Sequence, residues 1–165
     1  MRYILQLIAG ILLYISVPAQ TVNQSSTTGN TYAIIIGVAK YQYPEVRQLQ
    51  FASRDAAVFA DFLMSASGGL VPPQNIKLLT DSMATTGEVD KAIRWLVAKA
   101  REGDRVFIYF SGHGEVENVT SSKNGYLICY NTPSVAFIHM GLSIDYLNDV
   151  VNTMSVYTKD RKSVV

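Results

Sequence analysis

The chain has 165 residues, 48% of them hydrophobic, and a formal net charge of +1. This size and composition predict a single globular domain without a long disordered tail. The 14 basic and 13 acidic residues are spread along the chain, which excludes a basic footprint for nucleic acid. The only cysteine, Cys129, cannot form an internal disulfide, so the fold must depend on its core.

The first 19 residues have the pattern of a secretory signal peptide. Arg2 provides a short positive region, residues 3–17 form an apolar run, and residues 17–19 supply small side chains before a cleavage site. About 15 apolar residues fall short of the roughly 20 that cross a bilayer as a helix. We therefore expect export, to the periplasm or beyond in a bacterium, and no stable membrane anchor. Residues 20–30 are polar and predict a flexible linker to a domain over residues 31–165.

Strands and helices are predicted to alternate from residue 31 onward. Short β-branched and aromatic runs predict buried strands, and apolar residues at helical spacing predict the helices between them. Strands are predicted over residues 32–38, 76–79 and 105–110, and helices over residues 52–66 and 85–103. The order β-α-β-α-β predicts an α/β fold, a three-layer sandwich with a mostly parallel sheet flanked by helices.

Spacing also predicts which side of each helix faces the core. The inward residues are expected to be Val58, Phe59, Phe62, Leu63 and Ala66 in the first helix, and Val89, Ile93, Leu96, Val97 and Ala100 in the second. Thr85 and Glu88 match a capping box at the start of the second helix.

The remaining residues predict shorter elements. Residues 125–130 predict a short strand or hairpin arm, in which either Leu127 and Cys129 or Ile128 and Tyr130 point inward. A third helix is expected from a cap at Ser143 to about Ser155, with Leu147, Val150, Val151 and Met154 inward. Residues 162–165 have the pattern of a fourth strand that is incomplete.

Three loops follow the carboxyl ends of the predicted strands, where parallel sheets bind ligands. They cover residues 39–54, 80–86 and 111–124. Only the third loop contains a histidine, His113, between two glycines that can let the backbone bend sharply and approach a substrate. His113 is therefore the predicted acid–base residue, with an ordinary surface histidine as the alternative.

Four segments, in their order and spacing, resemble the caspase and metacaspase family. They are YAIIIGVAKY, LQFASRDAAVFADFL, LLTD and FIYFSGHGE. The resemblance covers about residue 31 to the end of the chain. It implies a caspase-like fold and a cysteine endopeptidase that acts on peptide or protein substrates without a cofactor.

The resemblance also implies roles for single residues. His113 aligns with the catalytic histidine, which assists a cysteine thiolate and protonates the leaving amine. Gly114 matches the glycine whose N–H helps to hold the oxyanion. Asp55 matches a metacaspase acid in the substrate pocket, which implies cleavage after Arg or Lys. In caspases proper an arginine of the early loop selects aspartate in the substrate, and Arg54 keeps this alternative open. Ser111 matches a family serine near the same pocket.

Two of these residues also have a purely structural interpretation. Asp55 falls early in a helix, where the macrodipole favours an acid. Ser111 falls at the end of a strand, where a hydroxyl can satisfy a turn.

The chain has no cysteine where the family places its nucleophile. A caspase histidine precedes its cysteine by about 50 residues, so His113 predicts a nucleophile near position 163, where the chain reads Ser163, Val164 and Val165. We therefore expect the chain to be the large-subunit portion of the enzyme, inactive alone. Cys129 is expected to be a buried core residue instead.

Two other functions stay open. One is a different histidine–cysteine peptidase of the same broad fold, gingipain-like or clostripain-like. The other is a non-catalytic caspase-like module that binds peptides or partner chains, and the reading frame beyond Val165 would distinguish it from an enzyme. His113 and His139 lack the spacing of a metal site, and no acidic loop has the spacing of calcium ligands.

Overall fold

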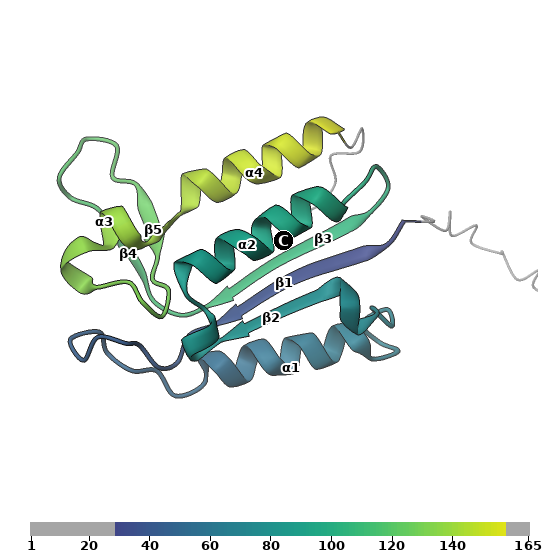
Figure 1. Ribbon diagram of the computed structural model, residues 1–165, viewed down its shortest axis with the longest axis horizontal. Helices are drawn as coiled ribbons and strands as arrows, with labels where there is room; N and C mark the ends of the chain where they lie inside the picture. Colours follow the sequence, from purple (N-terminus) through teal and green to yellow (C-terminus); the bar gives the residue numbers. More distant parts are fainter. Residues whose placement is uncertain (1–28, 158–165) are drawn as a thin grey trace, which may run out of the picture.

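The computed structural model describes residues 29–157. Strands β1 (Thr31–Gly37), β2 (Ile76–Thr80) and β3 (Arg105–Ser111) form a parallel sheet in the order β2-β1-β3. Helix α1 (Ala52–Met64) lies on one side of this sheet, and α2 (Thr86–Lys99) and α4 (Ile144–Tyr157) lie on the other (Figure 1). The predicted three-layer α/β architecture is confirmed, and the three strands begin within one residue of their predicted positions.

The central strand β1 divides the core into two clusters. Ile34 and Ile36 face α2 and α4, whereas Ala33 and Ile35 face α1. These four side chains are at most 1% exposed. Because helices cover both sides, every consecutive residue from Ala33 to Gly37 is buried, which explains the continuous apolar sequence there.

The predicted inward face of α1 is wrong at Val58 and Phe62, which are 58% and 47% exposed. The helix buries Ala52, Ala56, Ala60 and Leu63 instead. The reason is close packing on β1, because a Cβ at Gly37 would lie 2.5 Å from both the Ala52 carbonyl oxygen and the Ala56 Cβ. At this separation only small side chains fit beneath the helix. Leu63 is inward as predicted.

The predicted inward face of α2 is confirmed at Val89, Ile93 and Leu96 but is wrong at Val97, which is 41% exposed. The helix ends at Lys99, earlier than predicted. At its start, the Thr85 hydroxyl accepts a hydrogen bond from the Glu88 N–H at 3.2 Å, which confirms the cap. The Glu88 carboxylate pairs with Lys91.

A second, antiparallel sheet follows β3. It consists of β4 (Gly114–Val116), β5 (Gly125–Leu127) and β6 (Leu142–Ser143), in the order β4-β5-β6. The predicted hairpin arm is therefore β5. Because β5 ends at Leu127, strand alternation does not continue, and Ile128 and Cys129 are both buried.

Several short elements complete the described chain. These are the 3-10 turns η1 (Pro73–Asn75), η2 (Asp81–Met83) and η3 (Ser134–Ala136), and the helix α3 (Phe137–Met140). The Ser143 hydroxyl accepts from the Tyr146 N–H at 3.4 Å, as expected of a cap on α4. The predicted leader, residues 1–19, and the predicted fourth strand, residues 162–165, lie outside the described residues.

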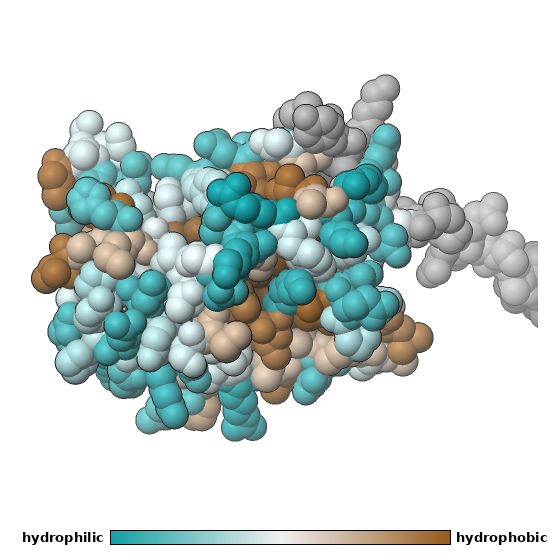
Figure 2. All heavy atoms as spheres, viewed as in Figure 1, coloured by the Kyte–Doolittle hydropathy of each residue, from teal (hydrophilic) through white to brown (hydrophobic). Residues whose placement is uncertain are grey.

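Strand β3 is only half-buried along most of its length, in contrast to the predicted fully buried strand. Within residues 29–157 it pairs with β1 alone, so its other side is open. Figure 2 shows apolar residues gathered in the middle of one face, at the height of the sheet between α2 and α1. Among the described residues, no helix is both long and apolar enough to cross a membrane.

Candidate active site

His113 lies where β3 ends and β4 begins, at the carboxyl end of the parallel sheet. The loop that leaves β1 passes beside it, because the Val38 N–H bonds to the Ser111 carbonyl at 2.8 Å. Two residues of that loop, Tyr41 and Arg47, contact the histidine. The site therefore combines the first and third of the loops predicted to hold function.

Three hydrogen bonds hold His113. Its N–H donates to the Tyr41 hydroxyl at 2.9 Å, its carbonyl accepts from the Ile128 N–H at 2.9 Å, and its Nε2 lies 2.7 Å from the Arg47 carbonyl oxygen. A carbonyl oxygen only accepts, so this last contact requires a proton on Nε2. In the neutral ring Nδ1 then carries the lone pair and is the nitrogen available as a base.

The His113 ring opens into a cavity of about 240 Å³. Its walls are formed by Glu45, Val46, Arg47, His113, Glu115, Ile128 and Ser134. The cavity thus combines an apolar wall with two carboxylates. Within residues 29–157 neither carboxylate has an ion-pair partner, so a cationic group entering the cavity would find both available.

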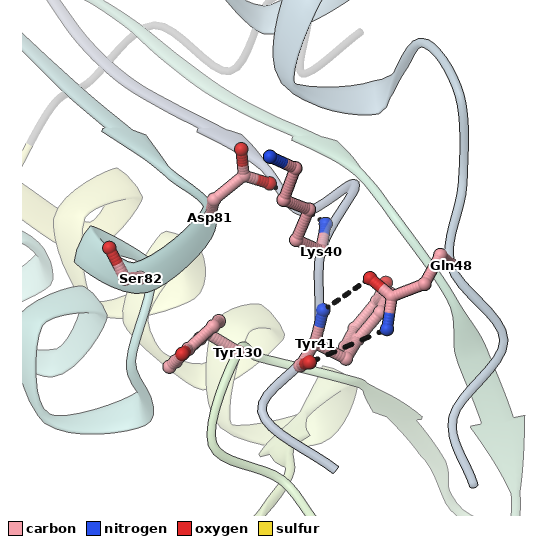
Figure 3. A pocket seen from close by; sticks show the side chains of 6 residues that line it. All are labelled: Lys40, Tyr41, Gln48, Asp81, Ser82 and Tyr130. Atoms are coloured by element: carbon pink, nitrogen blue, oxygen red, sulfur yellow. Dashed lines mark hydrogen bonds between the residues drawn. The ribbon is translucent and has the colours of Figure 1, made fainter. Parts of the chain in front are cut away.

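A second hollow of about 530 Å³ borders the loop after β1 (Figure 3). It is lined by Lys40, Tyr41, Gln48, Asp81, Ser82 and Tyr130. One Asp81 carboxylate oxygen accepts from the N–H groups of Ala39 and Lys40, each at 2.9 Å. Asp81 therefore anchors the start of the loop that reaches His113.

The backbone bends at Gly112, as predicted, although neither glycine beside His113 has a positive φ. Gly112 is needed for space, because a Cβ there would lie 2.8 Å from the Phe110 ring and 3.1 Å from the Tyr41 hydroxyl. Gly114 of β4 lies opposite Leu127 of β5. The residues just before and after these, His113 and Ile128, also lie opposite each other and are hydrogen-bonded. Hydrogen-bonded and non-hydrogen-bonded pairs alternate along antiparallel strands. Gly114 and Leu127 are therefore a non-hydrogen-bonded pair, and the Gly114 N–H points away from β5, as an oxyanion donor would require.

The other predicted site residues lie apart from these cavities. Arg54 and Asp55 are exposed in the first turn of α1, and Ser111 is half-buried at the end of β3. None of the three lines either cavity. Among the described residues the Asp55 carboxylate has no hydrogen-bond partner, so its substrate-binding role stays a prediction.

Sequence reasoning missed four residues that the structure brings to the site: Tyr41, Glu45, Arg47 and Gln48. All lie in the predicted loop after the first strand. Arg47 contributes only its carbonyl oxygen to the His113 contact. Every residue carries this group, so the presence of an arginine at position 47 could not have indicated the contact. Tyr41 stood in the segment YAIIIGVAKY and was the one position that the resemblance could have indicated.

Cys129 is confirmed as a core residue, because its side chain is 0% exposed. Burial in an apolar environment raises the pKa of its thiol to about 11. A thiol with this pKa is almost entirely protonated near neutral pH, and the thiolate is the nucleophilic form. Cys129 is therefore not the nucleophile for His113.

We expect the ionisation of Cys129 to make the domain less stable in alkaline solution. The pKa is about 9 in an exposed thiol and about 11 in the folded chain, so the stabilisation is complete below pH 9 and is lost as the pH rises toward 11. The linked loss is about 2–3 kcal/mol in the free energy of unfolding. Urea unfolding at pH 7.5 and 10.5 measures it, with Cys129→Ala as the control for other titrating groups. An equal pH dependence in both proteins would contradict the prediction.

The three-layer fold agrees with comparisons to known proteins. The Peptidase C14 caspase domain model matches residues 30–156, and the chain belongs to this family. It is 31% identical over 111 residues to a protein named "Probable protease" from a Desulfuromonadales bacterium, over 59% of this chain and 13% of that one. It is also 31% identical over 96 residues to metacaspase-1A of Aspergillus oryzae, over 54% of this chain and 22% of that one.

A solved structure shows the same fold. A protein from Geobacter sulfurreducens superimposes with a TM-score of 0.57 at 18% identity, over 73% of this chain and 44% of that chain. The chain thus spans less than a quarter of the length of the two curated relatives. The caspase-like resemblance predicted from the four segments is confirmed.

Proposed function

We propose that this chain carries the histidine half of a cysteine endopeptidase that cleaves after Arg or Lys. The observation that carries the proposal is the setting of His113. Its ring lies at the carboxyl end of a parallel strand, borders a cavity, and is held by the Arg47 carbonyl so that Nδ1 is open. Such a ring can accept a proton from a thiol and return it to the leaving amine.

The open side of β3 supports a nucleophile from the chain that follows α4. Helix α4 lies on the same side of the sheet as α2 (Figure 1). A right-handed crossover from β3 through α4 leads to the free side of β3, away from β1. The next strand would be parallel to β3, so its carboxyl end would lie beside His113, where a cysteine thiolate is needed.

The cavity beside His113 supports the preference for a basic residue. The aliphatic stem of a Lys or Arg can lie along Val46 and Ile128 while its charged end meets Glu45 or Glu115. Asp55, on α1, is the acid that the family resemblance suggests. The cavity acids, Glu45 and Glu115, and the α1 acid, Asp55, all favour a basic residue in the substrate. They differ in which carboxylate would contact that residue.

The test of the function is a peptidase assay on the product of the reading frame continued beyond Val165. Peptides that differ only in Arg, Lys or Asp before the scissile bond are compared. We expect cleavage after Arg and Lys and none after Asp. Cleavage after Asp would favour a role for Arg54, and no cleavage by a folded product that contains a cysteine after the next strand would favour a peptide-binding module.

Charge-removing variants distinguish the two sets of acids. A charge-assisted hydrogen bond contributes about 1.5–3 kcal/mol, so loss of the contacting carboxylate should lower kcat/KM for Arg peptides by about tenfold or more. Glu45→Gln, Glu115→Gln and Asp55→Asn are measured in parallel. Glu102→Gln is the control, because Glu102 is exposed in the turn before β3, at the opposite end of the sheet. Equal activity in all four variants would remove the acids from the proposal.

Export is also part of the proposal. It depends only on the leader pattern in residues 1–19. Recovery of the expressed protein outside the cytoplasm, shortened at its amino end, is the expected result.

A further inference from the structure

The side chain of Gln48 closes the loop that holds His113. Its Oε1 accepts from the Tyr41 N–H at 2.9 Å, and its Nε2 lies 3.4 Å from the Tyr41 carbonyl and 3.5 Å from the Val46 carbonyl. A carboxamide offers an acceptor and two donors, so Gln48 meets the backbone of Tyr41 as a neighbouring strand would. Figure 3 shows the two bonds between Gln48 and Tyr41.

Both ends of this closed loop contact His113. At one end, the Tyr41 hydroxyl accepts the His113 N–H, and the two rings lie 5.3 Å apart at 33°. At the other end, Arg47 is next to Gln48 in the chain, and its carbonyl oxygen meets Nε2 at 2.7 Å. The Gln48 side chain thus ties together the two groups that hold the histidine.

The position of the Arg47 carbonyl depends on its neighbours. The Arg47 side chain is exposed and has no hydrogen bond or ion pair within the described part of the chain. On one side of it, Val46 is buried, and on the other side Gln48 is bonded to Tyr41. Without the Gln48 bonds, this part of the loop would keep the buried Val46, whose N–H bonds to the Tyr43 carbonyl at 3.1 Å, and the Leu49 N–H, which bonds to the Ala39 carbonyl at 2.8 Å.

The Tyr41 hydroxyl is suited to accept the His113 N–H because it stays uncharged. Its side chain is 6% exposed, and burial raises the pKa of its hydroxyl above the ordinary value. The hydroxyl therefore accepts the His113 N–H over the whole range of pH in which an imidazole titrates.

We propose that Gln48 is a positioning residue for His113: by closing the loop onto Tyr41, it holds the Arg47 carbonyl against Nε2 and sets the ring as the Nε2–H tautomer with Nδ1 open. The catalytic consequence rests on the proposed peptidase function. The effect on the tautomer does not, because it is a property of this chain alone. A hydrogen bond of ordinary strength corresponds to a change of about fivefold in the tautomer ratio.

The test is the long-range proton–nitrogen NMR spectrum of the ¹⁵N-labelled chain at about pH 8, where an ordinary imidazole is neutral. The wild-type His113 should show a protonated Nε2 and an unprotonated Nδ1. In Gln48→Met, which keeps the length of the side chain but loses all three contacts, we expect the ratio to fall by about fivefold toward a mixture of tautomers. His139, exposed in α3, is the internal reference in every spectrum.

Two further variants separate positioning from a general loss of structure. Gln48→Glu keeps an acceptor for the Tyr41 N–H at 2.9 Å and should retain most of the wild-type signature. Gln50→Met changes an exposed glutamine two residues away and should have no effect. Because Gln48 is itself exposed, the variants should fold, and their amide spectra verify this.

A wild-type His113 signature in folded Gln48→Met would overturn the proposal, as would an equal change in Gln50→Met. If Gln48→Met fails to fold, a wild-type His113 signature in folded Gln48→Ala, which loses the same three contacts, overturns it instead. In the longer enzyme, Gln48→Met should lower kcat by about fivefold with KM unchanged. If the wild-type longer protein has no peptidase activity, the proposed function fails while the spectra still decide the role of Gln48.

Discussion

Under the proposed peptidase function, His113→Ala in the product of the reading frame continued beyond Val165 should lower kcat by about 10²- to 10⁴-fold, the range expected when a general acid–base group is lost. The physical reason is that His113 is the only imidazole that lines this cavity within residues 29–157; the other ionisable groups in its walls are the carboxylates of Glu45 and Glu115 and the Arg47 guanidinium. Tyr41 is buried and has a raised pKa, and Arg47 offers only a carbonyl oxygen to this contact. The measurement is kcat on an Arg peptide, together with urea unfolding to verify that the variant is folded.

His139→Ala is the matched control for this substitution. His139 is exposed in the last turn of α3 and lines neither cavity. Its loss should leave kcat unchanged. If His113→Ala retained full activity, the peptidase would have to work through another residue, and the proposed function of this site would be wrong.

Gly37→Ala should destabilise the domain by about 3 kcal/mol or more, the upper part of the range for overpacking a core. A Cβ at this position would lie 2.5 Å from the Ala52 carbonyl oxygen and from the Ala56 Cβ. Neither atom belongs to a flexible side chain, so α1 would have to move away from β1. Gly37 also pairs with Ser111, two residues before His113, so a shift here would disturb the site as well as the core.

Gly87→Ala is the control, and its effect should have the opposite sign. Gly87 lies in the first turn of α2, and a Cβ there would meet no atom within 4 Å. Alanine is favoured over glycine in a helix by about 0.5–1 kcal/mol, so this variant should be slightly more stable than wild type. Urea midpoints of the three proteins provide the comparison. A Gly37→Ala protein as stable as wild type would show that α1 does not press on β1.

The order of elements could be predicted because it depends on patterns local in the sequence. β1 is a continuous apolar run, and such runs are strands covered on both sides. The Thr85 cap and the start of α2 follow from side chains within one turn of each other. His113 could be singled out as a candidate for the same reason, because it follows a strand closely in a recognisable segment.

The inward face of α1 could not be predicted, because it depends on a partner distant in sequence. Hydrophobicity alone places Val58 and Phe62 inward, yet both are exposed. The absence of a side chain at Gly37 brings the start of the helix so close to β1 that only small residues such as Ala52 and Ala56 fit at that point. The inward face is decided by the distance between the backbones of α1 and β1. The spacing of hydrophobic residues in the sequence does not depend on that distance.

The sequence by itself determined the fold class and the family and indicated His113 as the candidate acid–base residue, since short apolar runs, caps and a strand-end histidine are all local features. Only the tertiary structure decided how that histidine is held. The Arg47 carbonyl that meets His113 is a backbone group, the same in every residue, and the Gln48 side chain binds backbone groups of Tyr41 and Val46. The loop that contains them lies beside His113 only because β1 and β3 pair and bring their following loops together.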